Sequence, residues 1–129
     1  MRISDTAELY LDDVEIPGEN RLPDALSLKQ ALACLDEARY GIAWGVIGAA
    51  AQCFDTALKY GGVREVFGQP LNRYQLCQEK LQYMIREISL MQLLVRWLAQ
   101  TKMNQRLHHS QISLAKQNNV EKAAGLLGE

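Results

Sequence analysis

The chain has 129 residues, of which 48 % are apolar and 22 % are charged, and its formal net charge is −1. This is the size and composition of one globular domain, and the balanced charge provides no electrostatic surface for nucleic acid or an anionic membrane. The sequence has no apolar run near 18 residues and three cysteines without Cys-x-x-Cys spacing, so we expect a cytoplasmic protein without a membrane span, disulfide framework or zinc site.

Residues 1–25 differ in pattern from the rest of the chain. Apolar residues alternate over residues 7–16, which predicts a half-buried strand, and Pro17-Gly18 predicts a turn after it. A single strand leaves its backbone donors and acceptors without partners. We therefore expect it to pair with another chain or with segments outside this sequence, which is a first indication that the chain is a fragment.

A long helix is predicted from residue 28 to about Tyr60. Ser27 followed by Gln30 is a capping-box pattern, and Gly61-Gly62 predicts the C-terminal end. About 33 residues make a helix of about 50 Å, a length typical of long-helix bundles. Its expected apolar face contains Leu28, Leu32, Leu35, Ile42, Val46, Ala50, Cys53 and Ala57.

Two further helices are predicted. We expect Asn72, with Gln75 three residues later, to cap the second, whose apolar residues repeat at alternating spacings of four and three: Cys77, Leu81, Met84, Ile88, Met91, Val95 and Leu98. The third is predicted to begin at Ser110, with one face formed by Ile112, Ala115, Asn119, Val120 and Ala123.

The predicted fold is therefore all-α, an up-down bundle of three long helices with a short N-terminal extended segment. Since the first helix is apolar over much of its circumference, a further helix or a partner chain is expected to cover it.

Charged residues interrupt the first helix. Asp36 and Arg39 are three residues apart, so they form an ordinary surface ion pair or, with Glu37, a polar cluster facing a ligand.

Three glycines follow on one face of the same helix. Gly41, Gly45 and Gly48 each cost roughly 1 kcal/mol relative to alanine. Close helix packing is the favoured explanation, and close approach of a flat ligand is the alternative.

The connection after the first helix contains Arg64 and Phe67, and Gln75 follows it. An arginine near a helix end is a natural phosphate partner, but the three residues are equally consistent with a solvated cation, a packed ring and a helix cap. His108-His109 has no carboxylate at ligand spacing, so no metal site is expected. Nucleophilic triads, HExxH and glycine-rich phosphate loops are missing from the sequence.

Two runs carry a family resemblance. Ala38-Arg-Tyr-Gly-Ile-Ala-Trp-Gly-Val-Ile-Gly and Arg64-Glu-Val-Phe-Gly-Gln-Pro-Leu, with Gln75 eleven residues after the arginine, resemble the C-terminal helical domain of acyl-CoA dehydrogenases, above all the glutaryl-CoA dehydrogenase branch. Ser4-Asp-Thr-Ala-Glu-Leu and Asp13-Val-Glu-Ile-Pro-Gly-Glu-Asn resemble the last strand of that family's middle β-domain and its exit. The resemblance implies a remnant of that β-domain and a linker in residues 1–25, and a truncated helical domain in residues 26–129.

The resemblance also implies site residues and partners. Arg64 and Gln75 match residues that contact FAD, in this family the FAD of a neighbouring subunit of a homo-oligomer, and Phe67 matches an aromatic residue near that cofactor. The family removes an α-proton from an acyl-CoA thioester and passes a β-hydride to flavin, and glutaryl-CoA members also decarboxylate the product. The residues matching its acyl-CoA site are Leu32, Ala33, Cys34, Leu35, Asp36, Glu37, Ala38 and Arg39.

No catalytic residue is expected in this chain. The glutaryl branch carries its catalytic glutamate in a Tyr-Glu-Gly-Thr-type segment that these 129 residues do not contain. The isovaleryl branch has its base immediately before the arginine, where this chain has Ala38, and Glu37 points about 100° away around the helix. We therefore expect the chain alone to be inactive. The rival interpretation is a non-enzymatic helical assembly that reuses the family's subunit interface.

Overall fold

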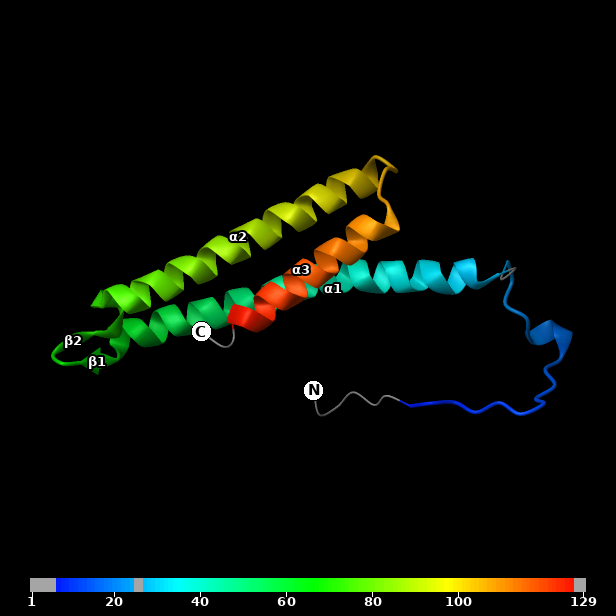
Figure 1. Ribbon diagram of the computed structural model, residues 1–129, viewed down its shortest axis with the longest axis horizontal. Helices are drawn as coiled ribbons and strands as arrows, with labels where there is room; N and C mark the ends of the chain where they lie inside the picture. The colour runs from blue at the N-terminus through cyan, green and yellow to red at the C-terminus, as the bar shows by residue number, and fades with distance from the viewer. Residues whose placement is uncertain (1–6, 25–26, 127–129) are drawn as a thin grey trace.

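The computed structural model describes residues 7–24 and 27–126, and it consists mainly of three helices. α1 spans Leu28–Val63, α2 spans Gln75–Met103 and α3 spans His109–Leu126. They lie side by side with short connections, as Figure 1 shows, so the predicted all-α bundle is confirmed. In the described part of the chain, no helix is both long enough and apolar enough to cross a membrane.

The N-terminal segment lies apart from the helices in Figure 1, where it turns at the start of α1 and runs back below them. Its described part, residues 7–24, is exposed and contains only the short 3-10 helix η1, Gly18–Asn20. The strand predicted over residues 7–16 does not form, because no described segment lies beside it to complete a ladder. The beginning of the β-domain resemblance and the predicted boundary at residues 25–26 lie outside the described residues.

α1 begins as predicted and ends later than predicted. Ser27 accepts a hydrogen bond from the Lys29 N–H, and Gln30 completes the capping box. The helix then continues through Gly61 to Val63, so the predicted stop near Tyr60 is wrong. Gly61 serves close packing instead of termination, since a Cβ built on it would lie 1.9 Å from Oδ1 of Asn72.

The core-facing side of α1 also differs from the prediction. Of the predicted stripe only Ala50 is fully buried, and Leu28, Leu32, Leu35 and Ile42 are exposed. The buried apolar residues are Ala43, Ile47 and Ala50. Because α1 is apolar around most of its circumference, periodicity could not select the face that α2 and α3 cover.

α2 contributes the large side chains of the core, and the repeat predicted for it is confirmed. Cys77 and Leu81 at its start are half-buried, and the rest of the repeat is buried: Met84, Ile88, Met91, Val95 and Leu98. α3 adds Ile112, Ala115, Ala123 and Leu126. Asn119 of α3 donates its side-chain amide to the Ala43 carbonyl of α1 at 2.9 Å, which joins these two helices within the core.

Two predicted caps are wrong. Asn72 lies in the 3-10 helix η2, Leu71–Arg73, and donates its amide to the Leu58 carbonyl at 2.9 Å, so it does not cap α2. α3 begins at His109, one residue before the predicted Ser110. Its first turn is capped by two side chains: Nδ1 of His108 accepts the Ser110 N–H, and Oε1 of Gln111 accepts the His108 N–H at 2.9 Å. At α3 the side chains of His108 and Gln111 take the capping role predicted for Ser110, whereas α2 begins after Tyr74 without a side-chain cap.

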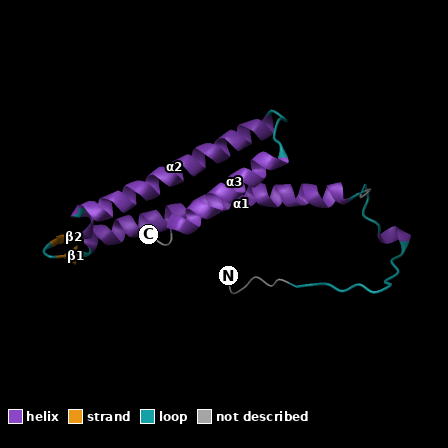
Figure 2. Cartoon of the chain, viewed as in Figure 1, coloured by secondary structure: helices purple, strands orange, loops and turns teal. Residues whose placement is uncertain are grey.

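A two-stranded hairpin, which was not predicted from the sequence, joins α1 to α2 (Figure 2). β1, Glu65–Val66, pairs antiparallel with β2, Gln69–Pro70. Phe67 and Gly68 between them both have positive φ, at 48° and 80°, as in a type I′ turn. The hairpin extends past the end of the bundle.

Candidate functional site

The predicted site residues fall into two groups at opposite ends of α1. Residues 32–39 lie in its first turns, beside the turn between α2 and α3, whereas Arg64 directly follows its last residue. Arg39 and Arg64 are 25 residues apart, which corresponds to about 37 Å along a helix. One chain therefore presents two separate surfaces.

The first surface is a groove of about 520 Å³. Four of the eight predicted substrate residues line it: Leu32, Ala33, Asp36 and Arg39. Lys29 of α1 and His109 of α3 complete the lining. Of the other four, Cys34, Leu35 and Glu37 are exposed, and Ala38 lines a neighbouring groove on another side of the helix.

The charges of this region are mostly paired along and between the helices. Arg39 Nη1 lies 3.3 Å from Asp36 Oδ1, so the ion pair considered from the spacing does form. Glu37 pairs with Lys102 of α2, whose Nζ also lies 4.5 Å from the centre of the Tyr40 ring. These contacts link the exposed start of α1 to the C-terminal end of α2.

The glycines at positions 41, 45 and 48 of α1 have no packing partner in the described chain. A Cβ built on Gly41, Gly45 or Gly48 would meet nothing within 4 Å, so the favoured explanation, close helix packing, is wrong for the contacts within this chain. Gly41 and Gly45 instead line an apolar groove of about 710 Å³ between α1 and α3. This groove is continued by Ala38, Ile42, Val46, Lys116 and Val120.

The second surface is formed by the hairpin and the start of α2. Phe67 is 95 % exposed at the hairpin tip, although positive φ is unfavourable for a bulky residue. The side chains of Arg64 and Gln75 are exposed and make no hydrogen bond or ion pair with other described residues. A free guanidinium, a free amide and an exposed ring fit a ligand such as FAD, which has a pyrophosphate and a flat aromatic system.

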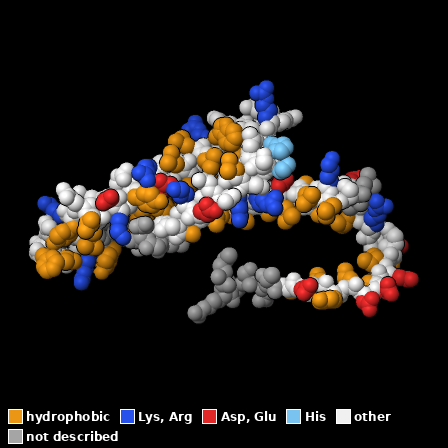
Figure 3. All heavy atoms as spheres, viewed as in Figure 1, with side chains coloured by type: hydrophobic (Ala, Val, Ile, Leu, Met, Phe, Trp, Pro, Cys, Tyr) orange, Lys and Arg blue, Asp and Glu red, His pale blue; other side chains and the backbone are white. Residues whose placement is uncertain are grey.

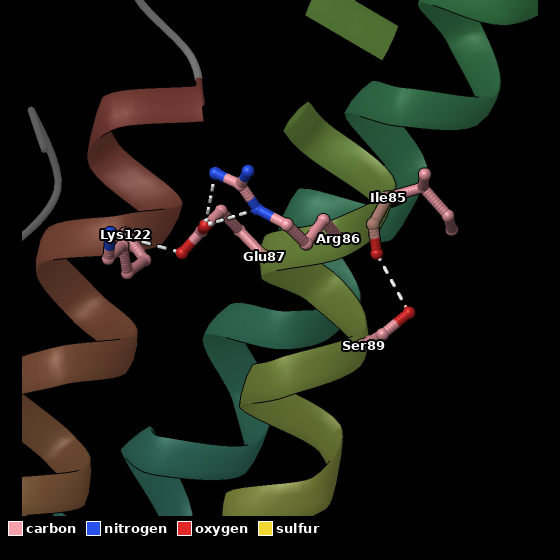
Figure 4. A network of polar contacts seen from close by, with 5 residues as sticks. All are labelled: Ile85, Arg86, Glu87, Ser89 and Lys122. Atoms are coloured by element: carbon pink, nitrogen blue, oxygen red, sulfur yellow. Dashed lines mark hydrogen bonds and ion pairs between the residues drawn. The ribbon is translucent and has the colours of Figure 1, made fainter. Parts of the chain in front are cut away.

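A buried carboxylate was missed by the sequence analysis. Glu87 of α2 is buried and ion-paired to Lys122 of α3 and to Arg86, each at 3.0 Å (Figure 4). The Lys122 hydrogen bond lowers the pKa of Glu87, Arg86 acts in the same direction, and burial opposes them. A carboxylate held ionised in this way is a weak proton acceptor, so Glu87 joins α2 to α3 and is poorly suited to act as a base.

His109, like Lys29, lines the groove but was not assigned to a site from the sequence. In Figure 3 the histidines lie at the turn between α2 and α3, next to the exposed start of α1. Only the packing of α3 on α1 brings His109 to the groove, so no local pattern could reveal it. Among residues 7–24 and 27–126, no cluster of three or more histidine, cysteine or acidic residues could hold a metal ion.

Comparison with protein families matches residues 28–127 to the family described as acyl-CoA dehydrogenase, C-terminal domain. A probable acyl-CoA dehydrogenase, YngJ, of Bacillus subtilis is 38 % identical over 117 residues, which cover 90 % of this chain and 31 % of that protein. The glutaryl-CoA dehydrogenase of Desulfococcus multivorans is 33 % identical over 115 residues, or 88 % of this chain and 30 % of that protein.

A solved structure is also similar. The glutaryl-CoA dehydrogenase of Mycobacterium smegmatis in complex with FADH2 superposes with a TM-score of 0.85 at 43 % identity, over 90 % of this chain and 30 % of that one. The chain thus spans less than a third of the length of these relatives.

Proposed function

The chain belongs to the acyl-CoA dehydrogenase family, and we propose that it forms one wall of an acyl-CoA site and provides a contact surface for FAD. The groove lined by Leu32, Ala33, Asp36 and Arg39 carries this proposal, because half of the residues matched to the family's substrate site line one groove. The apolar residues suit an acyl or pantetheine chain, and the polar ones suit its amides and thioester.

The proposed reaction of the complete enzyme is the α,β-dehydrogenation of an acyl-CoA thioester. The α carbon loses a proton to a base, the β carbon loses a hydride, and a carbon–carbon double bond forms between them. FAD, when bound, supplies the hydride acceptor. A glutaryl-type substrate, with decarboxylation of the product, is supported by the resemblance of residues 38–48 to that branch and by the 43 % identity to its M. smegmatis member.

We further propose that Arg64, Phe67 and Gln75 contact the FAD of a neighbouring subunit. The position of Arg64 at the far end of α1, about 37 Å from Arg39, supports this, because residues so far apart serve two centres more readily than one. An exposed ring held at unfavourable φ is also typical of residues kept for binding.

Acyl-CoA binding can be tested by calorimetric titration of the chain with glutaryl-CoA and butyryl-CoA. We expect both to bind, and Arg39→Gln to weaken binding about tenfold by removing the Asp36 pair and a donor of the groove. Lys59→Gln is the matched control, since Lys59 is an exposed cation at the other end of α1. Equal affinities for Arg39→Gln and wild type would contradict the proposal.

We also expect this chain alone not to reduce an electron acceptor with either thioester and FAD, because its 129 residues contain no match to the family's base. Turnover by the purified chain would refute this expectation.

A second candidate is a non-enzymatic helical assembly. It is favoured by the large apolar side chains exposed on α1 and α2, which include Trp44, Leu58, Leu90, Leu93 and Trp97. Size-exclusion chromatography with light scattering, with and without FAD, separates the candidates. A stable oligomer that neither retains flavin nor binds acyl-CoA would favour the assembly.

A further inference from the structure

The groove at the start of α1 contains two polar side chains that the proposed function does not use. Lys29 lies on its α1 side and His109 on its α3 side, 80 positions later in the sequence. Neither the Lys29 ammonium nor the His109 ring makes a hydrogen bond or ion pair with another described residue, apart from the stacking of His109 on His108. Two donors therefore remain unused at one groove.

The neighbouring charges leave the groove cationic. The two carboxylates of the region are already paired, Asp36 with Arg39 and Glu37 with Lys102. Glu37 and Lys102 line a second groove, which shares Asp36 and His109 with the first. Across these two grooves three cations (Lys29, Arg39 and Lys102) face the two carboxylates, a difference of one positive charge. Arg39 also uses only one of its five N–H groups for Asp36, so it retains donors of its own.

We propose that Lys29 and His109, with the remaining N–H groups of Arg39, bind an anionic, oxygen-rich group, and that this group is a phosphate of coenzyme A. The inference rests on the proposed acyl-CoA site, since Leu32 and Ala33 of the same groove would contact the apolar part of the same ligand. A phosphate accepts several charge-assisted hydrogen bonds at once, which matches an ammonium, an imidazole and a guanidinium at one groove. A carboxylate of a dicarboxylic acyl group has related chemistry, and the experiment separates the two.

The test is calorimetric titration of the 129-residue chain and its variants with coenzyme A, pantetheine and glutarate. We expect Lys29→Gln and His109→Gln each to raise the Kd for coenzyme A about fivefold and to leave the Kd for pantetheine, which has no phosphate, unchanged. The wild-type affinity for coenzyme A should also fall more steeply with sodium chloride than that of Lys29→Gln, a readout that a structural role would not move. Lys59→Gln should bind coenzyme A as the wild type does, and circular dichroism verifies that each variant folds.

Three outcomes would overturn the inference. Unchanged coenzyme A affinity in both variants would show that the two side chains do not bind it, while the acyl-CoA site would stand. Weakened glutarate binding with unchanged coenzyme A binding would assign the groove to a carboxylate instead. If the wild type binds neither coenzyme A nor pantetheine, the proposed acyl-CoA wall fails and the inference fails with it.

Discussion

Glu87 and Lys122 join α2 to α3 through a carboxylate–ammonium contact of 3.0 Å, with the carboxylate buried and the ammonium partly exposed. Glu87→Gln keeps the shape and removes the charge, so we expect the thermal midpoint at pH 7 to fall by about 3 °C. Glu79→Gln, which changes an exposed carboxylate two turns earlier on α2, should leave the midpoint unchanged.

The same pair predicts a pH dependence. The folded-state pKa of Glu87 is lowered from its ordinary value of 4.5, mainly by the Lys122 hydrogen bond. Its contribution to stability is therefore complete above about pH 4.5 and is lost as the pH falls through the lowered folded-state pKa. Thermal unfolding of wild type and Glu87→Gln from pH 7 to pH 2.5 should give midpoints that converge at the acidic end. A constant difference across this range would rule out the carboxylate charge as the cause.

Gly61→Ala should destabilise the fold by about 1 kcal/mol, because the new Cβ would displace Asn72 and break its 2.9 Å hydrogen bond to the Leu58 carbonyl. Asn72→Ala removes the side chain that the new Cβ would clash with. The double variant Gly61→Ala/Asn72→Ala should therefore be no less stable than the single variant Asn72→Ala. Urea unfolding of the four proteins measures this coupling. Additive effects would mean that the two residues do not meet.

Gly48→Ala should have the opposite effect. Nothing lies within 4 Å of a Cβ at this position, so the helix gains about 0.5–1 kcal/mol from the lower backbone entropy of alanine. Urea unfolding at two protein concentrations is the measurement. A loss of stability that grows with concentration would show that a second copy packs on this face in solution.

Phe67→Asn separates stability from binding. Asparagine tolerates positive φ and Asn-Gly is the preferred pair for a type I′ turn, whereas the 95 % exposed phenyl ring contributes little burial. We expect the variant to be more stable by about 1 kcal/mol and to bind FAD more weakly, measured by urea unfolding and by flavin fluorescence quenching. Unchanged flavin binding would remove Phe67 from the proposed cofactor surface.

Asn119→Ala should lower the free energy of unfolding by about 2 kcal/mol. Asn119 is 0 % exposed and its amide donates to the Ala43 carbonyl of α1, so the substitution removes a buried hydrogen bond and leaves a small cavity. Gln117→Ala, on the exposed side of α3, is the control and should change stability little. Equal stability of the two variants would contradict this assignment.

The buried face of a helix could be predicted from the sequence where large apolar side chains form the core, and not where alanines do. On α2, large apolar residues repeat at alternating spacings of four and three along one face, so the core residues from Met84 to Leu98 could be predicted although Leu90, Leu93 and Trp97 are exposed outside that face. On α1, leucines and isoleucines surround the helix while alanines face the core, so the pattern could not select a side. The hairpin was missed because Phe67 occupies a turn position where asparagine or glycine is the usual signal.

The candidate site, too, could be predicted from the sequence only in part. Family motifs identified the segments at residues 32–39 and 64–75, and the long helix predicted from residue 28 already placed them at its opposite ends. His109 and Lys122 act through contacts with α1 and α2 that arise only from tertiary packing. Such residues carry no local sequence signal.

The first buried residue of α1 is Ala43, so residues 28–42 form about four helical turns without a single buried side chain. Such turns open locally at a much lower free energy than the rest of the helix, and their amide protons should exchange with solvent fastest. The proposed acyl-CoA groove is built on this part. A ligand that occupies the groove would have to hold these turns in the helical state, which costs conformational entropy. Binding should therefore slow the exchange of their amide protons with solvent.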